Sequence, residues 1–152
     1  MAFSRALLNE QACAPQIAGL LQALAPAYAL MEERVPALAA RLGVVDGPWD
    51  ALARRTALDH DLALLSGFDV PASTAASRWL QRLRQLAAQS PHRLMAHVYV
   101  RYGGDLSGGQ QLAPHANAIL GRQGLPALSF WVFERPTAEL KHALHEIGRA
   151  HV

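Results

Sequence analysis

Residues 94–110, LMAHVYVRYGGDLSGGQ, restrict what this chain can fold into more than any other segment. The first half reads as a buried helix, and the second half sets Asp105 among four glycines, Gly103, Gly104, Gly108 and Gly109. Glycine inside a helix costs about 1 kcal/mol relative to alanine, so this density indicates that something requires the missing side chains. A helix without Cβ atoms can bend or lie directly on a flat ligand. The glycines by themselves are also consistent with a helix break or a close helix crossing.

The pentapeptide LSGGQ, residues 106–110, is also the signature of ABC-type ATPases. That signature works only beside a P-loop, GxxxxGK[ST], whose lysine contacts the phosphates. The single lysine, Lys141, lies in LKHAL, so the sequence contains no P-loop. The apolar run SFWVFERP, which could imitate a Walker B strand, has no aspartate at its end. An ATPase would therefore need a separate P-loop chain, and this interpretation is disfavoured.

The remainder of the chain reads as helices separated by glycine and proline, which predicts an all-α, single-layered bundle. Apolar residues at helical spacing predict a helix over 17–31, which Pro26 should kink or divide. A short continuation is expected over 36–43, and another helix over 48–67. Further helices are predicted from Ser73 or Thr74 to about residue 86, from Pro91 into the glycines, over 111–120, and over 137–149. Residues 130–133 have the pattern of a short strand.

Composition narrows the class of protein. A chain of 152 residues with 51% hydrophobic residues is expected to form one domain, 1–152, with its own core. Thirteen of the fourteen basic residues are arginines scattered along the chain, so nucleic acid is not an expected partner, although the formal charge of +2 suits an anionic ligand or an acidic protein. The only cysteine, Cys13, excludes an internal disulfide and any CxxC motif. The sequence shows no membrane span and no signal peptide, so we expect a cytoplasmic protein.

The segment at 94–110 resembles the distal helix of the haem oxygenases, whose pattern is AHxYxRYxGDLSGGQ. The matching residues are His97, Tyr99, Arg101, Tyr102, Gly104, Asp105, Ser107, Gly108, Gly109 and Gln110. Weaker similarities follow in the family's order at residues 29–35, 57–67, 128–133 and 140–149. The resemblance implies a helical bundle that oxidises haem to biliverdin, carbon monoxide and ferrous iron. It would use O₂ and electrons from a separate reductase or ferredoxin.

The resemblance also implies roles for individual side chains. Asp105 would hold water on the distal side of the ring and supply a proton there, while Arg101 and Tyr99 would join the hydrogen-bond network behind it. The ring face would be covered by Gly104, Ser107, Gly108 and Gly109. From the residues alone, Asp105 could instead be a helix cap, and the other two an ordinary buried tyrosine and a paired arginine.

Two more positions match sites that bind the haem carboxylates in the family. Lys141 and His145 stand four residues apart, so they share one face of the predicted final helix and could both reach the ligand. The alternative is an ordinary solvated helix face.

Haem iron needs an axial ligand, which this family takes from a histidine in its first helix. Met1 falls about where that helix has ended, and no histidine precedes His60. His97 belongs to the distal segment, where it would support the fold. We therefore expect no metal ligand from this chain, a family domain truncated at both ends, and an exposed apolar wall that favours a homodimer. Three hypotheses stay open: a haem oxygenase, a haem- or tetrapyrrole-binding module without turnover, and an inactive truncated homologue.

Overall fold

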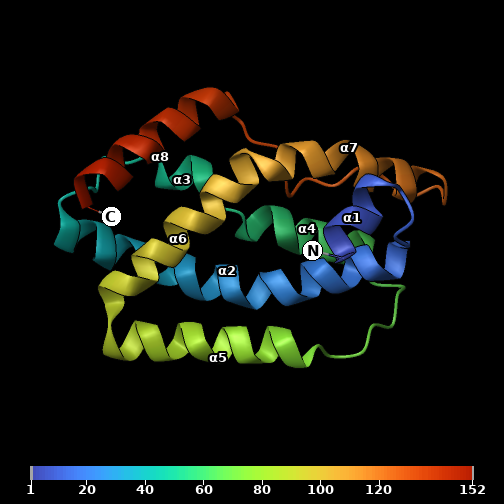
Figure 1. Ribbon diagram of the computed structural model, residues 1–152, viewed down its shortest axis with the longest axis horizontal. Coiled ribbons are helices and arrows are strands. Elements are labelled where there is room, and N and C mark those ends of the chain that lie inside the picture. The colour runs from blue at the N-terminus through green and yellow to red at the C-terminus, as the bar shows by residue number, and fades with distance from the viewer. Residues whose placement is uncertain (1, 152) are drawn as a thin grey trace.

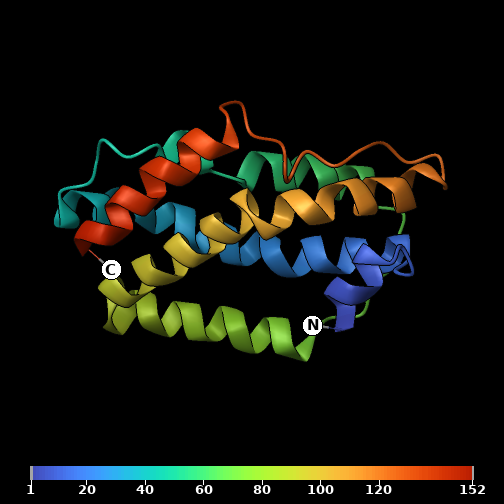
Figure 2. The same cartoon turned by 45° about the horizontal axis from the view of Figure 1, so that its top comes forward.

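The computed structural model describes residues 2–151, which form helices joined by turns and contain no strand. In Figure 1, α2 runs through the middle of the molecule and α5 lies along one side of it. Helix α6 crosses α2 obliquely and leads into α7. Figure 2 shows the same arrangement, with α8 beside α6, and Figure 1 shows the short α1 next to α7. The elements are α1 (Ala2–Leu8), α2 (Ala14–Leu42), α3 (Trp49–Leu52), α4 (Arg55–Leu64), α5 (Thr74–Gln89), α6 (Pro91–Leu106), α7 (Gly108–Gly121) and α8 (Thr137–His151). The all-α prediction is confirmed.

Helix α2 is continuous for 29 residues, with Pro26 and Pro36 inside it. Pro26 was expected to kink or divide the segment and Pro36 to start a separate continuation; the helix is not divided at either proline. Proline removes one backbone hydrogen bond and crowds the preceding turn. Here the apolar stripe of the helix is buried on both sides of Pro26, and this burial outweighs the local cost. The helix ends at Gly43, which has the left-handed backbone conformation (φ 70°) that glycine adopts without strain.

The helix expected over 48–67 is instead two helices, α3 and α4, with a break at residues 53–54. Arg54 explains the break, because its side chain turns inward and is only 6% exposed. Its Nε donates to the carbonyls of Leu52 at 3.1 Å and Ala53 at 2.9 Å, which removes both oxygens from helical bonding. Its backbone N–H donates to Glu32 of α2 at 2.7 Å. Tertiary contacts therefore set this boundary.

Two further boundaries differ from the sequence prediction. Helix α7 begins at Gly108 rather than at residue 111, so only Ser107 interrupts the path from α6 to α7. The expected strand over 130–133 is absent from the described residues, and this stretch is irregular backbone. Its polar groups bond to side chains of α7 and of the α3–α4 region instead of to a second strand.

The centre of the core lies where α2, α6 and the segment after α7 meet. Tyr28 of α2 is fully buried there, with the ring of Phe130 edge-on at 5.6 Å and the ring of Tyr102 at 6.1 Å between centroids. This aromatic cluster is directly behind the glycine-rich bend. Among the described residues, no helix combines the length and the apolar character needed to cross a bilayer.

Candidate ligand cavity at the glycine-rich bend

The bend between α6 and α7 forms one wall of a cavity of about 290 Å³. The short helix α1 and the N-terminal half of α2 form the facing walls, and Phe130 and Trp131 close one end. Most of the lining is apolar. Two of the side chains that line it are charged groups from the bend itself, Arg101 and Asp105. An apolar cavity with a few convergent polar groups is the usual form of a small-molecule site.

Gly104 and Gly108 present bare backbone to this cavity. A Cβ atom built at either position meets no atom within 4 Å, so the space beside them is open. Gly109 has a different reason to be glycine, because a Cβ there would lie 2.6 Å from the indole ring of Trp131. The first two glycines leave room for a ligand, whereas the third allows Trp131 to pack closely. Ser107 lies between them in sequence but does not line the cavity.

Asp105 is the buried acid of the site, with 3% of its surface exposed. The hydroxyl of Tyr28 donates a short hydrogen bond to its Oδ2. Burial raises the pKa of Asp105 to about 6, against the opposing effects of the Tyr28 hydrogen bond and the Arg101 charge. Burial and the adjacent carboxylate also raise the pKa of Tyr28, so the tyrosine keeps its proton. The pair therefore holds a carboxyl group that can exchange a proton near neutral pH.

Arg101 lines the cavity beside Asp105. Its guanidinium carbon lies 5.9 Å from the ring centroid of Tyr28 and 5.7 Å from that of Trp79 on α5. Its Nε is buried, and no described residue accepts a hydrogen bond from it. An unsatisfied buried donor costs about 1–3 kcal/mol, and the described side chains do not offset this cost at Arg101 Nε.

Tyr99, Lys141 and His145 do not line the cavity. A Cβ at Gly148 of α8 would lie 2.5–2.7 Å from ring atoms of Tyr99, so this tyrosine fills the contact between α6 and α8. Lys141 and His145 are on the exposed face of α8. Of the residues singled out in the sequence, the structure thus gathers Asp105, Arg101, Gly104, Gly108 and Gly109.

Sequence reasoning missed Tyr28 and Trp131. Tyr28 stands 77 residues before Asp105, in the apolar stripe of the helix predicted over 17–31. The only signal of its role was a hydroxyl on an otherwise apolar helix face. Trp131 lay in the run interpreted as a strand. Its packing against Gly109 could not be inferred from spacing, because the two residues meet only after the chain has turned back from α7.

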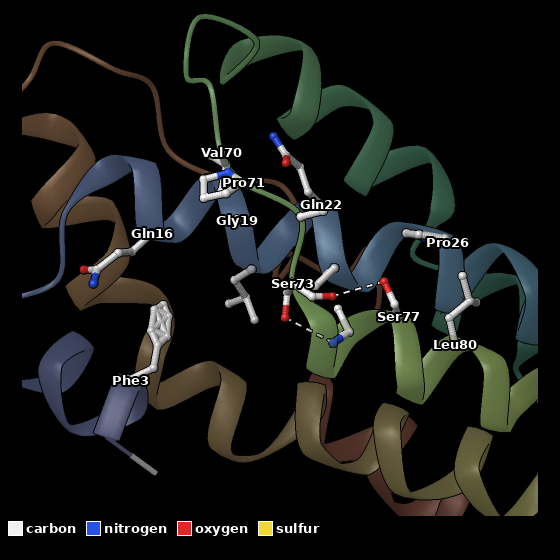
Figure 3. Close-up of a pocket in the computed structure, with 14 residues that line it drawn as sticks. Phe3, Gln16, Gly19, Gln22, Pro26, Val70, Pro71, Ser73, Ser77 and Leu80 are labelled. Carbon is white, nitrogen blue, oxygen red and sulfur yellow. Dashed lines mark hydrogen bonds between the residues drawn. The ribbon is translucent and has the colours of Figure 1, made fainter.

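A larger groove of about 540 Å³ lies between α2, α5 and the loop before α5 (Figure 3). It shares Phe3 and Leu20 with the cavity at the bend. No charged residue lines it, and two of its hydroxyls are engaged at the start of α5. Ser73 Oγ accepts from the N–H of Ala76 at 3.1 Å, and Ser77 Oγ donates to the carbonyl of Ser73 at 3.1 Å. With no acid or base in its lining, the groove is a weaker candidate for chemistry than the cavity at the bend.

Comparisons with known proteins agree with this geometry. The family model described as "Heme oxygenase" matches residues 1–146. The chain is 41% identical over 88 residues to the heme oxygenase of Takifugu rubripes, covering 54% of this chain and 31% of that protein. It is 45% identical over 65 residues to heme oxygenase 1 of Synechocystis sp., covering 40% of this chain and 27% of that protein. The solved structure of heme oxygenase from Leptospira interrogans superposes with a TM-score of 0.82 at 29% identity, covering 99% of this chain and 77% of that one.

A helical bundle with an aspartate in a glycine-rich bend over a cavity defines a haem oxygenase-type fold. The chain belongs to the haem oxygenase family. It spans about a third of the length of the curated relatives named above, 31% for the Takifugu protein.

The residues at the bend fit one face of haem. Gly104 and Gly108 would let the flat ring approach the backbone, and Arg101 and Asp105 line the same cavity. On the other face, no histidine lines the cavity among the side chains that the structure describes. A cavity of about 290 Å³ is also small for so wide a disc, so part of the ring would extend beyond it.

Proposed function

We propose that this chain is a haem oxygenase, which cleaves haem to biliverdin, carbon monoxide and ferrous iron with O₂ and electrons from a separate donor. The observation that carries the proposal is the buried Asp105, held by Tyr28 beside two glycines whose backbone is open to the cavity. Family membership supports it. The activity known by name for the longer relatives is a proposal here, because this chain spans only part of their length.

Each side chain at the bend has a definite task in this proposal. Gly104 and Gly108 form the surface against which the ring lies. Haem held against these residues would supply the iron that activates O₂. Asp105 holds a water molecule next to the ring and exchanges a proton with that water. A carboxyl group with a pKa of about 6 transfers protons efficiently near neutral pH. Tyr28 keeps the carboxylate in one orientation. Arg101 lines the cavity beside Asp105, where its positive charge favours the carboxylate form.

We further propose that Lys141 and His145 bind the two haem carboxylates. They lie one helical turn apart on the exposed face of α8, and Tyr99 packs α6 against that helix through Gly148. A ring seated on Gly104 would have to extend beyond the described cavity to reach them. Lys141→Ala should then weaken hemin binding several-fold without altering the circular dichroism, and an unchanged affinity would remove the pair from the site.

The electron donor is proposed to be an acidic protein such as a ferredoxin or a reductase. Residues 70–104 contain five arginines and neither aspartate nor glutamate. Four of these arginines are exposed, three along α5 and one at the start of α6: Arg78, Arg82, Arg84 and Arg93. The inner face of α5 carries Trp79, which contacts Arg101 of the cavity. The exposed arginines of α5 and of the start of α6 suit docking of an acidic carrier.

One observation favours a second function, which is to hold a tetrapyrrole without turnover. The described lining of the cavity has no histidine, so the iron would lack its usual axial partner. A visible spectrum after addition of hemin, followed by a reductase and NADPH, separates the two functions. Loss of the Soret band with formation of biliverdin and carbon monoxide supports the oxygenase. A stable band under the same conditions supports the binding module. The homodimer and the cytoplasmic location expected from the sequence stay predictions.

A further inference from the structure

Residues 128–133 form an irregular segment, here called the strap, that brings Phe130 and Trp131 into the end wall of the cavity. Irregular backbone that runs beside a core must find partners for its polar groups. The first of these is Asn117 of α7, whose Oδ1 accepts from the N–H of Leu128 at 2.9 Å. The remaining partners decide where the cavity wall stands.

Asp61 of α4 receives the next two N–H groups of the strap. Its two carboxylate oxygens accept from the N–H of Ser129 at 2.8 and 3.0 Å, and its Oδ2 also accepts from the N–H of Phe130 at 2.8 Å. The side chain is fully buried, with no exposed surface. A carboxylate has acceptor sites only, so both of its oxygens can face the two converging N–H donors.

The carbonyl groups of the strap are held from the other side. Arg54 Nη1 donates to the carbonyls of Phe130 at 2.9 Å and Val132 at 2.8 Å. Gln110 Nε2 donates to the carbonyl of Trp131 at 2.8 Å and to the backbone carbonyl of Asp105 at 3.0 Å. One amide group therefore ties the strap to the backbone of the proposed catalytic acid.

The strap in turn contacts the site through its two aromatic rings. Phe130 meets the ring of Tyr28 edge-on at 5.6 Å, and Tyr28 is the hydrogen-bond donor to Asp105. Trp131 lies against Gly109 at the bend. A displacement of the strap would thus move the end wall of the cavity and the support of Tyr28 together.

We propose that Asp61 is a positioning residue for the ligand: it fixes the strap, and the strap sets which edge of the haem ring faces Asp105. This inference rests on the proposed function. Asp61 does not itself line the cavity, so it acts through Phe130 and Trp131. If Asp61 contributed only to fold stability, its replacement would not change the position of the ligand in the molecules that still fold.

The test compares Asp61→Asn with Asp59→Asn, a matched change at an exposed position on the same helix. Asparagine keeps the shape but turns one acceptor into an NH₂ group, which faces at least the N–H of Ser129 in either orientation of the amide. In Asp61→Asn we expect a mixture of biliverdin isomers in place of the parent's isomer pattern, and a fall in kcat of about 10- to 100-fold, as for other small misplacements of a substrate. Asp59→Asn should behave as the parent.

The strap itself can be followed without turnover. The chain has three tryptophans, so Trp49→Phe with Trp79→Phe leaves Trp131 as the only reporter. In this background, Asp61→Asn should shift the Trp131 emission to the red and weaken its quenching by hemin. Gln110→Ala, which releases the strap at a part-buried site, should act in the same direction and serves if Asp61→Asn fails to fold.

The outcomes separate this inference from the proposed function. The parent's isomer pattern and turnover in both variants, with unchanged Trp131 emission, would overturn it. A red-shifted Trp131 with an unaltered isomer pattern would also overturn it, because the strap would then move without moving the ring. If neither parent nor variants cleave haem, the proposed function fails. The positioning role is then judged by hemin quenching of Trp131 alone, where loss supports it and no change refutes it.

Discussion

The hydroxyl of Tyr28 donates a hydrogen bond to Oδ2 of Asp105 across 77 residues of sequence, and both side chains are buried. This contact joins the long central helix α2 to the glycine-rich bend. It gives the carboxyl group a fixed orientation in an environment that raises its pKa to about 6. The chemistry proposed for the cavity depends on that combination.

Replacing Asp105 with alanine should keep hemin binding and reduce biliverdin formation by at least about 100-fold, the usual contribution of a positioned acid–base group. The apolar walls and the open glycines, which bind the ring, are untouched by this change. Single-turnover assays with supplied electrons measure the effect, with Asp59→Ala as the exposed control. A mutant that forms biliverdin at the parental rate would remove Asp105 from the reaction.

Tyr28→Phe should move the acidic limb of the pH–rate profile to higher pH. The Tyr28 hydrogen bond lowers the pKa of Asp105 against the larger effect of burial, so its removal raises that pKa above about 6. The loss of a donor to a buried carboxylate should also destabilise the fold by about 1–3 kcal/mol. Turnover measured between pH 5 and pH 8, together with urea unfolding, tests both effects. A profile that stays in place contradicts the assigned contact.

Asp105 also makes stability depend on pH in a defined direction. Its folded-state pKa of about 6 lies above the ordinary value of 3.8, so the folded chain binds more protons between these values. The contribution is therefore fully present below about pH 4 and is lost as the pH rises through about 6. Relative to Asp105→Asn, the free energy of unfolding of the parent should fall over this window and stay level above it. A difference that increases with pH would show that the carboxyl is stabilised in its charged form.

Gly108→Leu should prevent hemin binding while the helix gains up to about 1 kcal/mol of intrinsic propensity. The added side chain would project into the open space beside Gly108 that the ring requires. Gly103→Leu is the matched control, since Gly103 also has open space around it but does not line the cavity. Hemin titration and circular dichroism measure the two effects separately. Equal hemin affinity in the two variants would refute close approach of a ligand at Gly108.

Hemin added to this chain should bind weakly with a broad Soret band, and free imidazole should sharpen the band. The reason is that no histidine lines the cavity among the described side chains. If the unmodified chain binds hemin tightly with a histidine-ligated spectrum, one of its seven histidines reaches the iron. The expectation that this chain provides no axial ligand for the iron would then be wrong.

Reversal of charge on α5 should slow electron delivery. Arg78→Glu combined with Arg82→Glu is expected to reduce the rate with an acidic [2Fe–2S] ferredoxin by about tenfold or more at low salt, and the difference should shrink as salt screens the charges. Arg55→Glu with Arg135→Glu makes the same change in net charge at exposed positions elsewhere. Reduction by dithionite should be equal in all three proteins. Equal rates with ferredoxin would exclude this face as the docking surface.

By itself the sequence determined the helical class and the position of the bend. Helix formation depends on local spacing and on local start and stop residues, so the pattern correctly predicted the starts of α5 at Ser73 or Thr74, of α6 at Pro91 and of α8 at Thr137. The glycines around Asp105 were also recognisable in the sequence, because a cluster of such poor helix formers inside a helical segment indicates a structural or functional requirement.

Only the tertiary structure decided which side chains meet there. Local rules predicted that Pro26 would kink or divide α2, yet burial of the surrounding stripe keeps the helix undivided. The break before α4 depends on Arg54, whose guanidinium bonds to carbonyls 76 and 78 residues away. The strap resembled a strand because apolar spacing does not reveal whether a partner strand exists. Contacts such as the hydrogen bond from Tyr28 to Asp105 join distant segments. They form because folding buries both polar groups together, and no local sequence pattern predicts which groups are buried together.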